Sequence, residues 1–387
     1  MDFSLSEEQE MLKRSARDFL EKECPKTLVR EMAEDEKGYS PQLWHEMAEL
    51  GWLGVNFPAD YGGADGSFLD LIILIEEMGR ALLPSPFLAT VILGGLSIRE
   101  AGSHEQKRRY LPEVAKGDLL LTLAITEPGA RYEADPTTVN AKATRHQSDF
   151  IINGTKLFVP YAHVANYLIC AAKTEDKARL GEDITNFIVN ANNPGITCAP
   201  LGTIGRDKQC EVTFENAMVP SRDILGELNG GWTDIKNTLQ KATIAICAEM
   251  NGGTQQILEM SVSYAKERTQ FGRHIGSFQA IQHRCADMLV TLEASRTLTY
   301  EAAWRIGQGL PCTMEVSMAK AWASESYRQA TWLGSQIHGG ISYIEDHDMP
   351  LYYRRAKATE VTLGDADVHR EIIARELLGE EGKHDGW

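Results

Sequence analysis

The sequence predicts an α+β protein in which a block of helices, a block of strands and a second block of helices follow one another. Apolar residues recur at helical spacing in the first third of the chain, and short β-type runs fill the middle. Long amphipathic runs follow the Gly230-Gly231 pair. Because helices and strands are segregated rather than alternating, we expect three domains, at residues 1–118, 119–228 and 229–387.

The first domain opens with a helix-start signal. Ser6 is followed three positions later by Gln9, which predicts a capping box, and apolar residues then recur at helical spacing from Met11 to Leu20. After glycine-rich breaks, a second helical pattern covers Leu69–Arg80. This domain is therefore predicted to be helical.

The middle domain consists of short runs typical of strands. They lie at Leu119–Ile125, Phe150–Val159, Asn166–Cys170, Thr185–Val189 and Glu211–Phe214. In the second run, Asn153-Gly154 separates two apolar halves, and this dipeptide predicts a tight hairpin turn.

The last domain consists of long helical runs punctuated by glycine and proline. They cover approximately Trp232–Lys266, Phe278–Ile306, Cys312–His338 and Leu351–Leu378. Pro311 and a glycine pair after His338 separate the later runs.

Composition excludes several classes of protein. The net charge of −16 argues against nucleic acid or an anionic membrane as the main partner. No apolar run approaches the roughly 20 residues that span a bilayer, and the acidic start lacks the features of a signal peptide. The seven cysteines are scattered and never spaced as C-x-x-C, which predicts reduced thiols in a cytoplasm and no metal site.

Candidate binding residues lie at two predicted helix ends that are followed by glycine. Arg268 and Phe271 stand in the segment R-T-Q-F-G, where a guanidinium can grip a pyrophosphate and an aromatic ring can cover a flat ligand. Gln336 leads into Gly339 and Gly340, where the missing Cβ atoms let backbone approach such a ligand closely. Taken singly, each motif also fits an ordinary helix end, with a capping arginine or a glycine C-cap.

Together with Thr126 in the segment T-E-P-G, these motifs resemble the flavin-binding motifs of the acyl-CoA dehydrogenase family. The resemblance runs from Leu5 to about Leu378. It implies an N-terminal helical domain, a middle β-domain and a C-terminal four-helix bundle. It also implies FAD as cofactor, and contacts to FAD from Arg268, Phe271, Gln336, Gly339, Gly340, Thr126 and Phe158.

The implied activity is α,β-dehydrogenation of an acyl-CoA, with electrons passed to an electron-transfer flavoprotein and a homotetramer, or at least a dimer, as the assembly. Phe158-Val159-Pro160 stands where the family has W-I-T. Phe158 can still cover the flavin face, whereas Pro160 lacks the side-chain donor that usually reaches flavin N5. This variant resembles a bacterial subgroup that acts on varied, often non-standard CoA thioesters, so a cyclic, aromatic or otherwise non-standard acyl group is one expectation for the substrate.

The family's catalytic glutamate is missing from both of its usual positions. These positions correspond here to Leu363 and Ala242, neither of which can accept a proton. Three carboxylates are candidates for the base, in the order Glu249, Asp365, Glu360. Each of the three also fits an ordinary structural or solvated carboxylate, and Asp365 also fits a contact to the flavin. A carboxylate from the first segment, or a group on the substrate itself, is an equal alternative.

Two other functions therefore stay open. The first is a different flavoenzyme reaction on an acyl-CoA, such as a desulfinase-like elimination, which needs no base for the α-proton. The second is a non-catalytic subunit that pairs with a catalytic homologue. Intact flavin motifs argue against the second.

Overall fold

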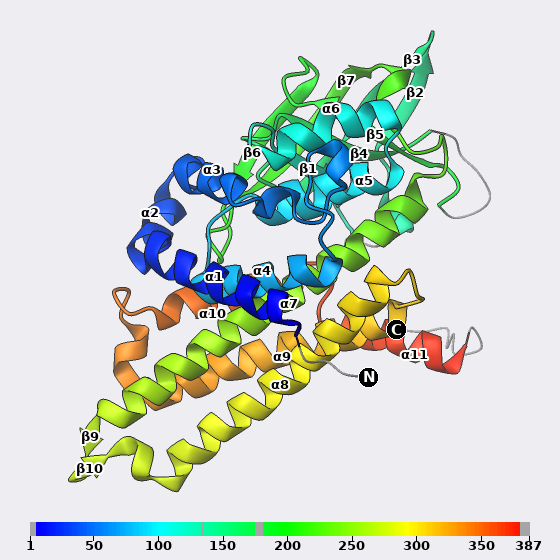
Figure 1. The fold of residues 1–387 in the computed structure, drawn as a ribbon. Coiled ribbons are helices and arrows are strands. Elements are labelled where there is room, and N and C mark those ends of the chain that lie inside the picture. The colour runs from blue at the N-terminus through cyan, green and yellow to red at the C-terminus, as the bar shows by residue number, and fades with distance from the viewer. Residues whose placement is uncertain (1–4, 133–134, 175–180, 380–387) are drawn as a thin grey trace. The chain divides into compact units, whose positions relative to one another are not determined.

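The computed structural model describes residues 5–132, 135–174 and 181–379, and the chain divides into two compact units (Figure 1). Unit 1 comprises Met1–Arg30, Phe68–Leu83 and Thr243–Trp387, and unit 2 comprises Glu31–Ser67 and Pro84–Ala242. Each unit therefore combines segments that are distant in sequence. The first helices cluster with the C-terminal bundle rather than with the rest of the predicted first domain.

Unit 1 is built from long helices. They are α1 (Glu7–Glu23), the start of α2 (Lys26–Glu34), α4 (Phe68–Ala81), most of α7 (Gly231–Glu267), α8 (Gln279–Gly307), α9 (Thr313–His338), α10 (Met349–Val361) and α11 (Ala366–Leu378). Short elements connect them: β9 (Thr269–Gln270), β10 (Arg273–His274), η6 (Ile275–Ser277) and η7 (Gly339–Tyr343). Helix α9 packs against α8, α10 and α11, and α4 packs against α1 and α8.

Two sequence predictions for these helices have different outcomes. The capping box is confirmed, because the Ser6 side chain accepts from the Gln9 backbone N–H and the Gln9 side chain accepts from the Ser6 N–H. The single helix expected over Leu351–Leu378 is wrong, because the chain ends α10 at Val361 and begins α11 at Ala366. A left-handed glycine, Gly364, lies in this break.

Glycines let α4 and α7 touch through their backbones. A Cβ atom added at Gly252 would lie 1.8 Å from the Glu76 carbonyl oxygen, and one added at Gly79 would lie 2.1 Å from the Glu249 carbonyl oxygen. Neither distance allows any side chain, so these two positions fix how closely the helices pack.

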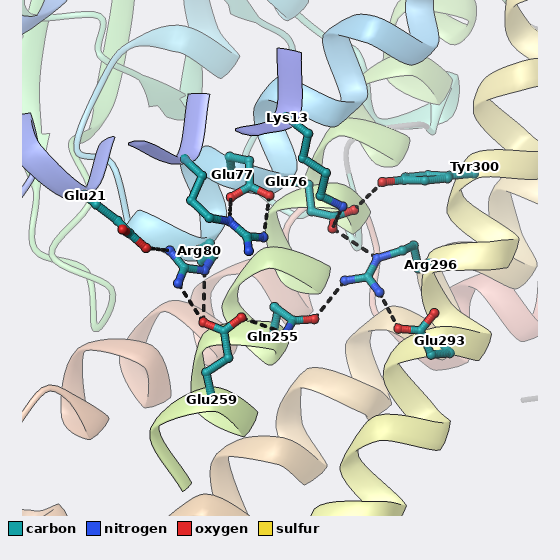
Figure 2. A network of polar contacts seen from close by, with 11 residues as sticks. Lys13, Glu21, Glu76, Glu77, Arg80, Gln255, Glu259, Glu293, Arg296 and Tyr300 are labelled. Carbon is teal, nitrogen blue, oxygen red and sulfur yellow. Dashed lines mark hydrogen bonds and ion pairs between the residues drawn. The ribbon is translucent and has the colours of Figure 1, made fainter. Parts of the chain in front are cut away.

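A buried ionic network joins α1, α4 and α8 inside unit 1 (Figure 2). The Glu76 carboxylate accepts hydrogen bonds from Lys13 Nζ at 3.0 Å, Arg296 Nε at 3.0 Å and the Tyr300 hydroxyl at 2.8 Å. Burial alone would raise the pKa of Glu76, but Arg296 and Lys13 lower it below its ordinary value. The buried carboxylate is therefore held ionised by groups from two other helices.

Unit 2 combines short helices with one mixed sheet. Its helical elements are α3 (Pro41–Glu49), η1 (Trp52–Gly54), η2 (Ala59–Tyr61), η3 (Leu88–Gly95), α5 (Leu96–Ala101), α6 (His104–Ala115), η4 (Pro136–Thr138) and η5 (Ser221–Asp223). Its strands are β1 (Leu121–Ala124), β2 (Lys142–His146), β3 (Asp149–Pro160), β4 (Tyr167–Lys173), β5 (Ile184–Asn190), β6 (Ile196–Leu201), β7 (Gln209–Val219) and β8 (Ile224–Leu225).

The strands lie in the order β6-β7-β3-β2-β4-β5-β8, and β1 pairs with β4. The β1–β4 and β2–β4 pairs are parallel, and the other pairs are antiparallel. Side chains on one face form a core that includes Phe150, Phe187, Val212 and Phe214. This core makes the sheet a rigid support for the loops at its edges.

The hairpin expected at Asn153-Gly154 is wrong. These residues lie inside β3, which continues through them because it is paired with β2 on one side and β7 on the other. The glycine is needed for close packing, since a Cβ atom at Gly154 would lie 2.6 Å from that of Ala141. The hairpin turn between β2 and β3 lies at Gln147-Ser148 instead.

Within the described ranges, no helix has both the length and the apolar character that crossing a membrane requires.

Candidate functional site

In unit 2, the structure brings together two of the predicted flavin contacts, Thr126 and Phe158. The Leu157 N–H donates to the Thr126 carbonyl oxygen at 2.8 Å, so the loop after β1 lies against β3. Phe158 lies in a β-bulge, with a φ of +54°, and its side chain is 57% exposed. A non-glycine residue in this conformation is costly, and bulges commonly re-aim a side chain at a functional site.

A buried ion pair holds the Thr126 loop in place. Lys156 is fully buried, and its Nζ donates to Glu127 Oε1 at 2.6 Å and to the Ile125 carbonyl at 3.2 Å. Glu127 also accepts from the backbone N–H groups of Asn140 at 2.9 Å and Ala141 at 3.0 Å. Sequence reasoning missed this pair, although a lysine within an apolar strand is itself a signal, because a buried charge requires a partner.

In unit 1, Arg268 and Phe271 lie at an exposed hairpin after α7. Strands β9 and β10 pair across Phe271-Gly272, which have φ angles of +54° and +76°. The Phe271 ring is 92% exposed and Arg268 is also exposed. Phe278 packs edge-on against Phe271, with ring centroids 6.1 Å apart. An aromatic ring this exposed is available to a ligand or to a second protein surface.

Gln336, Gly339 and Gly340 lie where α9 ends. Gly339 has φ +68° and ψ −147°, a conformation essentially restricted to glycine. Gly340 is exposed, and a Cβ atom placed on it would meet nothing within 4 Å among the described residues. Nothing in the described chain therefore requires a glycine there, which fits close approach by a group outside the chain.

The ends of α7 and α9 are joined by stacked rings. Tyr264, one turn before Arg268, stacks on His338 with centroids 4.7 Å apart. His338 directly precedes Gly339, so the Arg268 segment and the glycine pair belong to one end of the bundle.

A groove of about 810 Å³ in unit 1 begins at this end. Its lining includes Gln336, the exposed aromatic residues Trp332, Tyr343 and Tyr353, and the cation Lys357. Glu325 and Glu345 also line the groove, and Lys357 is paired with Glu360, so the exposed rings suit a flat ligand or a second protein surface.

At the two usual base positions, the structure places apolar residues in contrasting surroundings. Ala242 is completely buried in α7. Leu363 is half-buried in the connection between α10 and α11 and has a φ of +60°. A leucine in the left-handed region needs support from its surroundings.

That support comes from Lys320 and His369. Lys320 is fully buried in α9, and its Nζ donates to the Thr359 carbonyl at 3.1 Å, the Glu360 carbonyl at 2.9 Å, the Gly364 carbonyl at 2.7 Å and Ser324 Oγ at 3.3 Å. His369 Nε2 donates to the Leu363 carbonyl at 2.9 Å. Burial lowers the pKa of His369 to about 4, so the ring is a neutral donor. Neither residue was predicted from the sequence. Lys320 could have been, because a lysine on an apolar helical face is a buried charge that requires a partner.

Glu249 has an ionic partner. Its Oε1 lies 3.1 Å from Arg355 Nε on α10, and the carboxylate is half-buried. Burial first, and then the negative charge of Glu249, raise the pKa of the neighbouring Tyr327. The carboxylate therefore lies in a confined, partly desolvated environment in unit 1.

Asp365 and Glu360 have structural contacts of their own. Asp365 is the N-cap of α11 and accepts from the backbone N–H groups of Asp367 at 3.1 Å and Val368 at 2.9 Å. Glu360 accepts from Lys357 Nζ at 2.8 Å. Both flank Leu363 in sequence, but each has a role that needs no catalysis.

Three family models together match most of the chain. The acyl-CoA dehydrogenase N-terminal domain matches residues 6–118, the middle domain matches residues 122–217, and the C-terminal domain matches residues 229–378.

Individual relatives align over nearly their full length. The chain is 35% identical to acryloyl-CoA reductase (NADH) of Anaerotignum propionicum over 382 residues, which are 98% of this chain and 96% of that protein. It is 32% identical to the caffeyl-CoA reductase-Etf complex subunit CarC of Acetobacterium woodii over 380 residues, 96% of this chain and 99% of that protein. The structure of butyryl-CoA dehydrogenase from Megasphaera elsdenii superposes with a TM-score of 0.90 at 31% identity, covering 98% of this chain and 100% of that one.

Proposed function

Because the chain belongs to the acyl-CoA dehydrogenase family, we propose that it is an FAD-dependent enzyme that dehydrogenates an acyl-CoA thioester between its α and β carbons. Members of this family are oxidoreductases that act on CH–CH bonds, and they bind FAD. The observation that carries the proposal is the match of all three domains together with the junction of Thr126 and Phe158 in unit 2.

The described residues fit a flavin cofactor. Phe158 presents an exposed ring on a strained bulge, beside a loop that the Lys156–Glu127 pair holds rigid. At the end of the bundle in unit 1, Gly340 leaves open space next to Gln336. When bound, FAD supplies the acceptor for the hydride that leaves the β carbon of the substrate.

We assign Arg268, Phe271, Gln336, Gly339 and Gly340 to a flavin shared with a second copy of the chain. Phe271 is too exposed to serve the fold of its own unit, and the groove beside Gln336 is lined with uncovered aromatic residues. A homotetramer, or at least a dimer, would cover these surfaces. A purified protein that is monomeric by light scattering yet retains FAD would refute the shared site.

The electrons are proposed to pass to an electron-transfer flavoprotein. This rests on the family and on the relative from Acetobacterium woodii, which is named as a subunit of an Etf complex. The acyl group is proposed to be cyclic, aromatic or otherwise non-standard, because Phe158 and Pro160 stand where the family has tryptophan and threonine. Relatives named for acryloyl-CoA and caffeyl-CoA are consistent with such variety.

We propose Glu249 as the base that removes the α-proton. Among the three candidates, Asp365 is committed to the cap of α11 and Glu360 to the charged groups around it. Glu249 lies seven residues, about two turns, beyond Ala242 on α7, so both positions lie on roughly the same face. Arg355 Nε lies 3.1 Å from Glu249 Oε1 and orients the carboxylate.

The Glu249→Gln variant tests this assignment. We expect kcat to fall at least about 100-fold, because general-base catalysis typically contributes that much. Glu259→Gln is the matched control, because Glu259 lies on the same helix and is also ion-paired, to Arg80 at 2.6 Å. If both variants turn over at similar rates and the pH profile of the Glu249 variant is unshifted, Glu249 is not the base.

The second candidate function is a flavoenzyme reaction on an acyl-CoA that needs no α-proton abstraction, such as a desulfinase-like elimination. It is favoured by the apolar residues at both usual base positions, Leu363 and Ala242. Product analysis separates the two functions, because only dehydrogenation yields an enoyl-CoA.

Anaerobic mixing with acyl-CoA thioesters tests the proposed function directly. Straight-chain, branched, cyclic and aromatic acyl-CoAs should be compared, and at least one should bleach the yellow flavin absorbance. A protein that does not take up FAD, or a flavin that no thioester reduces, would refute the proposal.

A further inference from the structure

Unit 2 also contains a cluster of two thiols and an imidazole, none of which has been given a role above. Cys210 is buried on β7, and Cys198 is half-buried on the neighbouring strand β6. In the β6–β7 register, Cys198 pairs with Val212 and Cys210 pairs with Pro200. The two cysteines are therefore diagonal neighbours on the same face of the sheet.

His163 completes the cluster from the turn after β3. Its Nδ1 lies 3.6 Å from Cys210 Sγ, and its Nε2 lies 3.0 Å from the Glu36 carbonyl oxygen. Because a carbonyl only accepts, Nε2 carries a proton, and the ring is oriented with Nδ1 toward the sulfur. A cysteine sulfur beside an oriented imidazole is the arrangement that favours a thiolate.

The electrostatics of the cluster agree with its geometry. A hydrogen bond from the Cys198 thiol, and then contacts from His163, lower the pKa of Cys210 below its ordinary value, although burial opposes the shift. The same hydrogen bond raises the pKa of Cys198. The contact with Cys210 raises the pKa of His163. Cys210 is therefore the nucleophile of the pair and Cys198 the protonated partner.

A cavity reaches the imidazole side of the cluster. His163 lines a cavity of about 740 Å³ in unit 2, whose walls also include Pro200 and Gln209, the neighbours of Cys210 across and along the strands. Among the described residues, no group of three His, Cys, Asp or Glu side chains has the arrangement of a metal site.

We propose that Cys198 and Cys210 form a redox-active dithiol that hydrogen peroxide converts to a disulfide. The Cys210 thiolate attacks one peroxide oxygen, the O–O bond breaks, and the departing hydroxide takes a proton from His163 to become water. The Cys198 sulfur then attacks the Cys210 sulfenic acid, the S–O bond breaks, and the leaving hydroxide takes the Cys198 proton. Two thiols and one peroxide give one disulfide and two waters.

The position of the pair allows this bond to form. Diagonal neighbours on antiparallel strands have Cα atoms roughly 7–8 Å apart, whereas a disulfide needs about 4.4–6.8 Å. Forming the disulfide therefore requires the Cα atoms of Cys198 and Cys210 to move about an ångström closer together. Strand β6 ends the described order of the sheet and pairs there with β7, so it can move without breaking a second ladder.

The disulfide would act on the proposed flavin strand. Cys210 pairs directly with Val159, the residue after Phe158, across the β-bulge between β3 and β7. Disulfide formation at Cys210 would displace this part of β7 and, through the Val159–Cys210 pair, change the orientation of Phe158. This consequence rests on the proposed function, whereas formation of the disulfide does not.

Peptide mapping of peroxide-treated protein tests the dithiol. The reduced full-length protein is treated with hydrogen peroxide near pH 7, and its remaining thiols are blocked in acid before digestion without reductant. We expect a cross-linked peptide joining Cys198 and Cys210, formed at least about tenfold faster than Cys285 is oxidised. Cys285 is the internal control, because it is also half-buried but burial raises the pKa of its thiol. No cross-link, or equal oxidation of Cys285, would overturn the proposal.

Variants separate the roles of the three groups. His163→Gln should slow cross-linking at least about fivefold, since it removes the imidazole that favours the thiolate. Cys198→Ser should abolish the cross-link and leave Cys210 to be oxidised to sulfinic acid. Cys285→Ser should leave the rate unchanged. The readout is a peptide mass, so it does not depend on bound flavin. A protein that forms the disulfide but binds no FAD would refute the proposed function and leave the dithiol proposal standing. Equal cross-linking rates in wild type and His163→Gln would refute the assignment of His163.

Discussion

The buried carboxylate of Glu76 allows a sharp test of how unit 1 is held together. The Glu76→Gln substitution preserves shape but removes the charge that faces Lys13, Arg296 and the Tyr300 hydroxyl (Figure 2). An amide cannot neutralise the two cations, and its N–H groups would point at donors.

The expected loss in the free energy of unfolding is about 3 kcal/mol. Removing one member of a buried ion pair typically costs about 3–5 kcal/mol, because the remaining charge stays desolvated. The lower end applies here, because Arg296 keeps its contacts with Glu293 and Gln255. Lys13 is also partly exposed, so water can compensate it.

The difference between wild type and Glu76→Gln should depend on pH. Arg296 and Lys13 depress the folded-state pKa of Glu76 below its ordinary value of 4.5. A carboxylate with a depressed pKa contributes stability that is fully present above the unfolded pKa and is lost as pH falls through the folded pKa. The two proteins should therefore differ fully at pH 7, and the difference should shrink as pH falls below about 4.5.

Urea denaturation followed by circular dichroism at pH 7 and pH 4 measures these differences. Glu293→Gln is the matched control, because Glu293 pairs with the same Arg296 but is mostly exposed, and it should cost at most about 1 kcal/mol. If Glu76→Gln costs no more than Glu293→Gln, or if its cost is unchanged at low pH, the ionic network does not stabilise unit 1 as argued.

Three further outcomes follow from the candidate site. Lys156→Met should lower the fraction of FAD retained after gel filtration, because it removes the ion pair with Glu127 that holds the loop carrying Thr126. The exposed Lys142→Met is the control and should retain FAD like the wild type. Equal retention by both variants would contradict a role of the Lys156–Glu127 pair in FAD binding. Phe271→Ala should change the unfolding free energy by less than about 0.5 kcal/mol yet reduce FAD retention and oligomer mass, unlike Leu378→Ala at another exposed site. Asp365→Ala should cost about 1 kcal/mol through loss of the α11 cap and leave the pH profile of turnover unshifted; a shifted profile would make Asp365 a catalytic candidate again.

Local patterns in the sequence were enough for the fold class and most elements. The capping box at Ser6, the helical periodicity and the strand runs depend on residues within a few positions of one another, so they can be predicted without coordinates. The motifs around Arg268 and Gly339 were likewise recognisable, because helix ends with glycine and charge have local causes.

Predictions failed where distant segments decide the outcome. No turn forms at Asn153-Gly154, because β3 continues through these residues and is paired with β2 on one side and β7 on the other. Gly154 is needed instead because Ala141 packs too closely against it to leave room for a side chain. Similarly, the run Leu351–Leu378 has the periodicity of one helix, but the chain breaks it at the loop that buried Lys320 holds from α9.

The order of residues along the chain was sufficient to predict helices on either side of a β-domain and to identify the residues proposed to hold a flavin. The pairing of charges became visible only in the folded chain: Lys156 with Glu127, Glu76 with two cations, and Glu249 with Arg355. Secondary structure follows from neighbours along the chain. The state of a buried charge or thiol depends on groups that folding brings from far away, as His163 is brought to Cys210.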